Sequence, residues 1–175
     1  MKIEKIHHVA YRCKDARETV EWYRDNLNMD FVLAIAEDKV PSTGEPDPYM
    51  HVFLDAGMGN VLAFFELPTR PPMGRDPNTP AWVQHIAFKV KDRETLLGFR
   101  DRLEANGIEV LGVTNHSIFH SIYFFDPNGH RVELACPDPE EEEMLERLDK
   151  VKWEMLEEWS RTKKAPKHAD WIHDH

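Results

Sequence analysis

The feature that most constrains the fold of this chain is an internal repeat. The segment His8-Val-Ala-Tyr-Arg-Cys-Lys-Asp15 recurs as His85-Ile-Ala-Phe-Lys-Val-Lys-Asp92 in the second half of the sequence. The first copy lies in a run of β-branched and aromatic residues that alternate with other residues, as in a strand. Asp15 is a residue type that caps the helix following it. The repeat predicts that one structural unit occurs twice in the chain.

The same elements are expected to follow both copies. Residues with the spacing of one helix face are Val20, Tyr23 and Leu27 in the first copy, and Leu96, Phe99 and Leu103 in the second. Strands are expected at 3–13, 31–36, 51–54 and 61–67, and again at 108–113, 119–125 and 130–136, with a polar, Pro-rich loop over 37–48. The sequence therefore predicts an α+β protein with two βαβββ modules in tandem.

The boundaries of these modules follow from composition. The first module is expected at 1–67 and the second at 81–138. Residues 68–80 between them contain five prolines and one glycine, which is typical of a linker. A C-terminal helix and tail are expected at 139–175.

The C-terminal helix is predicted to be amphipathic, because Leu148, Val151, Met155 and Trp159 are spaced three or four residues apart. This stripe is expected to cover either the sheet of its own chain or a partner subunit. The tail beyond it carries His168, His173 and His175 and is expected to dock loosely.

Charge and composition exclude several classes of partner. The net charge of -10 argues against nucleic acid, since binding phosphates needs clustered Lys and Arg. No apolar run reaches the roughly 18 to 20 residues that cross a bilayer, and the N-terminus has no apolar secretion segment. We therefore expect a cytoplasmic protein with no membrane partner. Cys13 and Cys136 are too few for a disulfide framework and are expected to be buried thiols.

A candidate metal site follows from the repeat. His8 and His85 occupy the same place in the first strand of each module, so two modules paired about a pseudo-twofold axis can bring both imidazoles to one point. A carboxylate from the last strand, Glu133, would complete a set of two histidines and one carboxylate. Such a set suits Fe(II), which keeps open positions for substrate and dioxygen. It equally suits Zn(II), Mn(II) or Ni(II) as a Lewis acid.

With these residues the chain resembles the vicinal oxygen chelate superfamily, which includes glyoxalases, epimerases, bleomycin-resistance proteins and extradiol dioxygenases. The resemblance covers about residues 3–137. His8-Val-Ala and His85-Ile-Ala are similar to the family's metal histidines, and Val132-Glu133-Leu134 to its metal glutamate. The resemblance implies a curved mixed sheet around a metal-binding cavity, with a small-molecule substrate.

Residues 116–133 are similar to the signature of the type I extradiol ring-cleavage dioxygenases. The matching positions, in order, are His116, Ile122-Tyr123, Asp126-Pro-Asn-Gly129 and Glu133. This resemblance implies Fe(II), a catechol-like substrate and insertion of both atoms of dioxygen beside the diol. It also implies that His116 and Tyr123 donate hydrogen bonds to the substrate oxygens or to bound oxygen.

Two positions depart from the extradiol pattern. Asn60 stands where these enzymes have an acid-base histidine, and asparagine cannot exchange a proton near neutral pH. His51 or His120 are the alternatives for that role. The second position is Glu66, a possible fourth ligand of the glyoxalase type. Aligning the turns places Ala63 opposite Glu133, so Glu66 faces the other side of the sheet unless a bulge intervenes.

We therefore expect a metal-dependent enzyme, with an Fe(II) extradiol dioxygenase favoured over a glyoxalase- or epimerase-like isomerase or lyase. A small-molecule binding or resistance protein is the third alternative. The substrate would be an aromatic diol or a compound of the α-hydroxy carbonyl type. We expect a homodimer, and the sequence leaves open whether the modules pair within one chain or between subunits.

Overall fold

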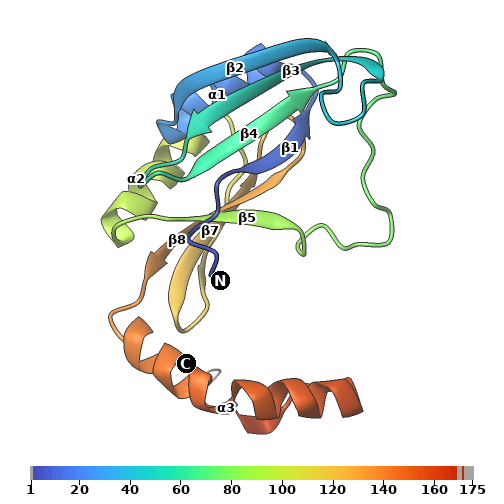
Figure 1. Ribbon diagram of the computed structural model, residues 1–175. Helices are drawn as coiled ribbons and strands as arrows, with labels where there is room; N and C mark the ends of the chain where they lie inside the picture. Colours follow the sequence, from blue (N-terminus) through green and yellow to red (C-terminus); the bar gives the residue numbers. More distant parts are fainter. Residues whose placement is uncertain (1, 169–170, 172–175) are drawn as a thin grey trace.

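The computed structural model describes residues 2–168 and residue 171, and it contains two βαβββ modules followed by a long helix (Figure 1). The first module consists of β1 (Val9–Cys13), α1 (Ala16–Leu27), β2 (Asp30–Lys39), β3 (Pro46–Asp55) and β4 (Val61–Glu66). The second consists of β5 (His85–Lys89), α2 (Arg93–Ala105), β6 (Leu111–Asn115), β7 (Phe119–Phe125) and β8 (Arg131–Pro137). The C-terminal helix is α3 (Glu141–Thr162).

Each module forms its own four-stranded mixed sheet. The strand order is β1-β4-β3-β2 in the first sheet and β5-β8-β7-β6 in the second. In both sheets the first strand runs parallel to the last, and the remaining pairs are antiparallel. The α+β class, the tandem modules and the C-terminal helix are thus confirmed. Within one chain, the curved surface is divided between two separate open sheets.

Three predicted boundaries were wrong. The first strand begins at Val9 and not at residue 3. The predicted loop over 37–48 is shorter, because β2 and β3 continue as a hairpin in which Glu37 pairs with Tyr49 and Lys39 with Pro46. The strand expected from residue 108 begins at Leu111. Ile108 instead donates its N–H to the Leu103 carbonyl at 2.9 Å and so closes the end of α2.

The aspartate that ends each repeat begins a helix. The Asp15 carboxylate accepts a hydrogen bond from Glu18 N at 2.8 Å, and the Asp92 carboxylate accepts one from Thr95 N at 2.9 Å. Each satisfies one of the free N–H groups of a helix N-terminus. The repeat therefore fixes the start of α1 and α2 as well as the strands before them.

The two modules share one hydrophobic core, which is built from their helix-covered faces. It includes Tyr23 of α1, Leu96 of α2, Phe64 of β4 and Phe124 of β7. The buried Cys13 and Cys136 are free thiols, as predicted. Because the modules pack through their helical sides, the opposite faces of both sheets remain open.

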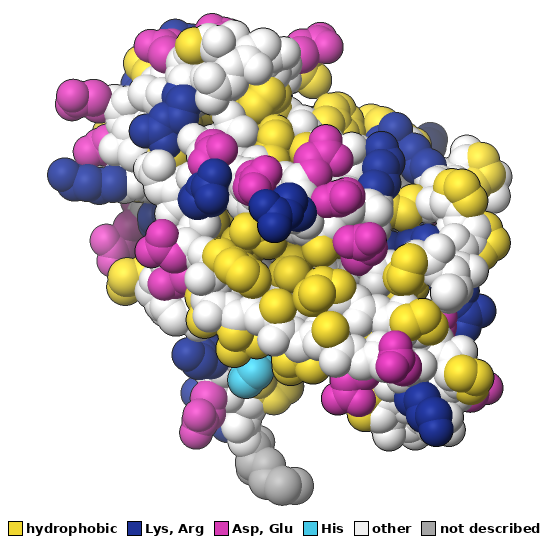
Figure 2. Space-filling view, turned by 90° about the horizontal axis from the view of Figure 1, so that it is seen from above, with side chains coloured by type: hydrophobic (Ala, Val, Ile, Leu, Met, Phe, Trp, Pro, Cys, Tyr) yellow, Lys and Arg dark blue, Asp and Glu magenta, His cyan; other side chains and the backbone are white. Residues whose placement is uncertain are grey.

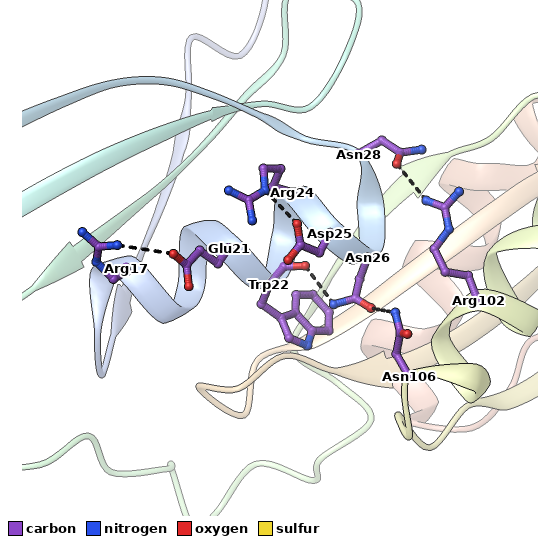
Figure 3. Close-up of polar contacts among 9 residues, drawn as sticks. All are labelled: Arg17, Glu21, Trp22, Arg24, Asp25, Asn26, Asn28, Arg102 and Asn106. Atoms are coloured by element: carbon purple, nitrogen blue, oxygen red, sulfur yellow. Dashed lines mark hydrogen bonds and ion pairs between the residues drawn. The ribbon is translucent and has the colours of Figure 1, made fainter.

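Polar contacts join the two helices at the edge of this core (Figure 3). Asn106 donates to the Asn26 side-chain oxygen at 2.9 Å, and Arg102 donates to the Asn28 side-chain oxygen at 2.8 Å. These contacts fix α1 against α2 and therefore fix the relative position of the modules.

Strand β2, at the edge of the first sheet, is strongly apolar and exposed along its whole length. Phe31, Val32, Leu33 and Ile35 are each between 44% and 54% exposed. The view from above the first module shows hydrophobic side chains gathered among charged ones (Figure 2). A ten-residue strand with this composition is normally covered.

Helix α3 lies apart from both sheets (Figure 1). Met144 is buried near its start, whereas Leu145, Trp153, Leu156 and Trp159 are 46% to 73% exposed. The tail lies along the helix, where His168 Nδ1 is 3.2 Å from Glu158 Oε2. His173 and His175 lie outside the described residues. Among the helices of the described ranges, none is both long enough and apolar enough to cross a membrane.

Candidate metal centre

His85 and Glu133 meet on the open face of the second sheet. Strands β5 and β8 are parallel neighbours, with His85 in register with Arg131 and Ala87 with Glu133. The His85 Nε2 and Glu133 Oε2 atoms are 2.9 Å apart. Glu133 is only 4% exposed. The fold thus brings together two of the three predicted ligands.

Two hydroxyl groups hold the other oxygen of Glu133. Tyr123, which lies opposite Glu133 in the β7–β8 register, donates to Oε1 at 3.1 Å. Ser121 also donates to Oε1. Both donors lie on the same strand face, two residues apart. They satisfy Oε1, so that Oε2 remains directed at His85.

The tautomer of His85 follows from its second contact. Its Nδ1 is 3.0 Å from the Val83 carbonyl oxygen, which can only accept, so Nδ1 carries a proton. A bare Nε2 lone pair would then face a carboxylate oxygen. Either a second proton or a metal cation must lie between them. Backbone carbonyls commonly orient a metal-binding histidine in this way.

A hydrogen-bonded chain leads from Glu133 to His116. The Tyr123 hydroxyl is 2.7 Å from His116 Nε2. Burial, and then the negative charge of Glu133, raise the pKa of Tyr123, so its hydroxyl stays protonated. Because that hydroxyl donates to Glu133, it accepts from His116 Nε2–H. Hydrogen bonds therefore connect His116 through Tyr123 to Glu133. The expected contacts of His116 and Tyr123 with substrate oxygens remain a prediction.

His8 lies elsewhere, beside the first sheet. Its Nδ1 is 2.9 Å from His7 Nδ1, and its ring centroid is 6.1 Å from that of His51 and 5.9 Å from that of Phe53. Its side chain is exposed. In the part of the chain that the structure describes, no three His, Cys, Asp or Glu side chains are close enough to share a metal ion. The three predicted ligands therefore do not meet within the described part of one chain.

The first sheet carries an aromatic counterpart of the second. Phe53 pairs with Ala63 as Tyr123 pairs with Glu133, so alanine occupies the place of the carboxylate. His51 stacks on Phe65 with 3.6 Å between ring centroids, and its Nε2 is buried without a partner. Burial, and then the neighbouring His8, lower the pKa of His51. Around His51 this face offers histidines and apolar rings, and Ala63 stands where the second sheet has Glu133.

Three other candidate residues lie away from the His85–Glu133 pair. Glu66 accepts a hydrogen bond from Ala16 N at 2.7 Å and so caps α1, on the helix side of its sheet. Asn60 donates to the Gly57 carbonyl at 2.9 Å in the β3–β4 turn. His120 Nδ1 is 3.7 Å from Asp138 Oδ2, on the face of β7 opposite Tyr123.

Ser121 and the Val83 carbonyl were missed by sequence reasoning. Ser121 had a detectable signal, because a residue two positions before Tyr123 must share its strand face. No sequence signal points to the Val83 carbonyl, because its contact with His85 depends on the backbone conformation just before β5.

The His85–Glu133 pair fits a divalent metal. Nitrogen and oxygen ligands lie about 2.0 to 2.2 Å from such a metal, so two neighbouring ligands are about 3.0 Å apart in octahedral and about 3.4 Å apart in tetrahedral geometry. The observed separation of 2.9 Å is close to the octahedral value and is also that of a direct hydrogen bond. The pair also has the hydrogen-bonded supports that orient metal ligands.

Comparisons with known proteins identify a family and several similar proteins. The family described as "Glyoxalase/Bleomycin resistance protein/Dioxygenase superfamily" matches residues 5–134. "Putative ring-cleaving dioxygenase MhqA" from Bacillus subtilis is 31% identical over 88 residues, which are 50% of this chain. The match spans only 28% of that relative's length.

Two further proteins match over more of their length. Metallothiol transferase FosB from Staphylococcus epidermidis is 24% identical over 136 residues, covering 77% of this chain and 82% of the relative. The fosfomycin resistance protein FosX from Listeria monocytogenes, solved with Mn(II) and sulfate, aligns with a TM-score of 0.57. That alignment has 20% identity and covers 81% of this chain and 98% of FosX. At this identity it supports the fold alone.

Proposed function

The chain belongs to the glyoxalase/bleomycin resistance protein/dioxygenase superfamily, and on this basis we propose that it is an Fe(II)-dependent extradiol dioxygenase. Its substrate would be a catechol-like aromatic. The observation that carries the proposal is the hydrogen-bonded chain from His116 through Tyr123 to Glu133. A Lewis-acid metal site needs the carboxylate, but it does not require a tyrosine and a histidine connected to it.

We propose His8, His85 and Glu133 as the metal ligands, with His8 supplied by a second copy of the chain. His8 and His85 occupy equivalent places in the sequence repeat. His8 lies beside His51 and Phe53 of the first sheet, and His85 lies beside Glu133 of the second. Pairing the first module of one copy with the second module of another would bring these two groups together. It would also cover Leu33 and Ile35, exposed apolar residues of β2 that lie opposite Phe53 and His51. Glu66 is left out of the ligand set, because its carboxylate caps α1.

His8, His85 and Glu133 would hold Fe(II) with coordination positions left open, and the ion would supply the oxygen-activating chemistry of ring cleavage. The chain's own residues would transfer the protons of the reaction. The His116 imidazole can donate and accept protons, and the Tyr123 hydroxyl connects it to Glu133. Ser121 and Tyr123 together hold Glu133 in one orientation. Phe53 and Phe65 of the facing module would line the site with flat apolar surface.

An isomerase or lyase of the glyoxalase type is the second candidate. It is favoured by Asn60, which is held in the β3–β4 turn and leaves no histidine at the position where extradiol enzymes have one. A divalent metal would then act as a Lewis acid on an α-hydroxy carbonyl compound.

Anaerobic loading with Fe(II), followed by oxygen uptake with a panel of catechols, separates the two candidates. We expect oxygen uptake together with a yellow ring-fission product, and neither of these from the Zn(II)-loaded protein. If no diol gives a ring-fission product and Zn(II) or Ni(II) supports isomerisation of an α-hydroxy carbonyl compound, the dioxygenase proposal is wrong.

A further inference from the structure

A cavity of about 410 Å³ lies beside the His85–Glu133 pair. It is formed by linker residues 73–81, the β7–β8 turn and the end of β1. His85 lines it, so the cavity shares a wall with the candidate metal centre. A volume of this size accommodates a small organic molecule. The structure of a single chain already contains this cavity, without a second copy.

The cavity is positively charged in an acidic protein. Lys14, Arg75 and Arg131 line it, although the chain as a whole carries a net charge of -10. Within the described ranges, no carboxylate lies within ion-pair distance of any of the three. The one acidic residue of the lining, Asp76, already accepts from Asn78 N and Thr79 Oγ1. Three cations thus face one carboxylate whose oxygens are both engaged.

Two of the cations lie on the same sheet face as Glu133. The Arg131 guanidinium carbon is 4.2 Å from the Tyr123 ring centroid, and Arg131 donates to the Trp82 carbonyl at 2.6 Å. The Arg75 guanidinium carbon is 5.8 Å from the ring centroid of Phe125, which pairs with Arg131 across β7 and β8. The hydrogen bond to Trp82 uses one of the five N–H groups of Arg131, and the ring contact of Arg75 uses no N–H group. Both guanidinium groups therefore keep N–H donors for a ligand.

The third cation is held at the turn. Lys14 Nζ donates to the Pro127 carbonyl at 3.0 Å, and Lys14 N donates to the Asn128 side-chain oxygen at 2.8 Å. The ammonium group has two further donors. Nearby, the rings of Tyr11 and His130 lie 4.8 Å apart and form an aromatic part of the wall.

From this arrangement we infer that the cavity binds the anionic group, a carboxylate or a phosphonate, of an aromatic substrate whose reacting end lies at the His85–Glu133 pair. The position of the reacting end rests on the proposed function. The binding of the anionic group in the cavity does not depend on it. Guanidinium groups match planar oxyanions by paired N–H donors, and Arg75 and Arg131 are both available for this contact. The cavity would therefore select catechols that carry a negatively charged side chain over neutral ones.

Direct binding to the metal-free full-length chain tests the inference without any turnover. The probes are phenylacetate, benzylphosphonate and the neutral phenylacetamide, measured by calorimetry at low salt. We expect at least one anion to bind roughly tenfold or more tightly than the amide, and Arg75→Gln to weaken its binding roughly tenfold, as for the loss of a charged hydrogen bond. The tighter of the two anions identifies the anionic group.

Arg17→Gln is the matched control, because Arg17 is exposed on α1 and pairs with Glu21 at 3.5 Å. Its binding of the anions should equal that of the wild type. Equal binding of all three probes, or no binding, overturns the inference. Wild-type anion binding by both Arg75→Gln and Arg131→Gln also overturns it, provided that both variants show wild-type circular dichroism.

A kinetic comparison with the Fe(II)-loaded enzyme separates this inference from the proposed function. Arg75→Gln should raise KM for 3,4-dihydroxyphenylacetate about tenfold and leave KM for 4-methylcatechol unchanged. Cleavage of both catechols without any effect of Arg75 would refute the cavity's role and leave the dioxygenase intact. Arg75-dependent anion binding without cleavage of any catechol would support the cavity and refute the dioxygenase.

Discussion

At the scale of single residues, Tyr123 is the side chain on which the site depends most. Its hydroxyl contacts both His116 and Glu133, and its ring makes a cation–π contact with the Arg131 guanidinium. Removing the hydroxyl alone separates these roles. The metal ligands would remain, because Ser121 still donates to Glu133 Oε1. The path for a proton between His116 and Glu133 would be broken.

Tyr123→Phe should therefore lower kcat by about 100-fold, a typical contribution of a positioned proton donor. Metal content should stay close to that of the wild type. Steady-state kinetics and elemental analysis of the same preparation measure both quantities. Glu133→Ala is the comparison, and it should lose metal as well as activity. A Tyr123→Phe variant as poor in metal as Glu133→Ala would show that the hydroxyl acts on the ligand and not on the proton.

Cys13 gives a second prediction at this scale. The side chain is 1% exposed, and burial raises its pKa to about 11 from the ordinary value of 9.0. Between these values the unfolded chain has lost the thiol proton while the folded chain keeps it. The free energy of unfolding should therefore fall by about 2 to 3 kcal/mol as the pH rises through this window. Urea unfolding at pH 8 and pH 11 would show a smaller fall for Cys13→Ala than for the wild type.

At the scale of elements, the repeat was sufficient to predict the modules but not all of their boundaries. Both first strands, both helices and their aspartate caps follow from residues 8–15 and 85–92. The β2–β3 hairpin does not, because prolines within 37–48 resemble a loop although Pro46 begins β3. The composition of 37–48 predicts a loop, but pairing with β2 keeps much of this segment in strands.

The β7–β8 turn shows how one element couples the modules. The Asp126 carboxylate, 5% exposed, accepts from the Tyr23 hydroxyl of α1 at 3.2 Å and from His130 N at 2.7 Å. It also accepts from Asn128 N at 2.9 Å. The turn motif thus anchors the second module on the helix of the first, as well as connecting two strands.

Asp126→Ala should lower the free energy of unfolding by about 2 to 4 kcal/mol, because several buried donors lose their acceptor. Asp55→Ala is a matched control at the β3–β4 turn, where the exposed Asp55 accepts from Gly57 N. It should cost less than about 1 kcal/mol. Chemical denaturation of both variants measures the difference. Equal losses in the two variants would contradict a coupling role for Asp126.

At the scale of the whole molecule, sequence reasoning proposed His8, His85 and Glu133 as metal ligands but could not predict how the fold distributes them. Their spacing in the sequence is compatible with modules that pair within one chain. The structure packs the two modules through α1, α2 and the β7–β8 turn, which leaves His8 and Glu133 on different sheets. That packing depends on buried contacts such as Tyr23 with Asp126, which no local pattern reveals.

Mixing two variants tests whether a second copy completes the site. His8→Ala and Glu133→Ala should each bind little metal alone. When the two are refolded together, about half of the dimers would contain one of each chain. In each such dimer, one of the two sites has all three ligands. Metal content and activity should therefore return to about one quarter of the wild-type values.

A second mixture provides the control for this prediction. His85→Ala and Glu133→Ala alter ligands that lie 2.9 Å apart in the same chain. If His8 comes from the other copy, each site of a mixed dimer still lacks either His85 or Glu133, so no metal binding should return. Recovery with the His8→Ala mixture but not with this one requires a shared site. No recovery in either mixture would mean that the three ligands come from one chain, and that the modules move apart from the packing seen here.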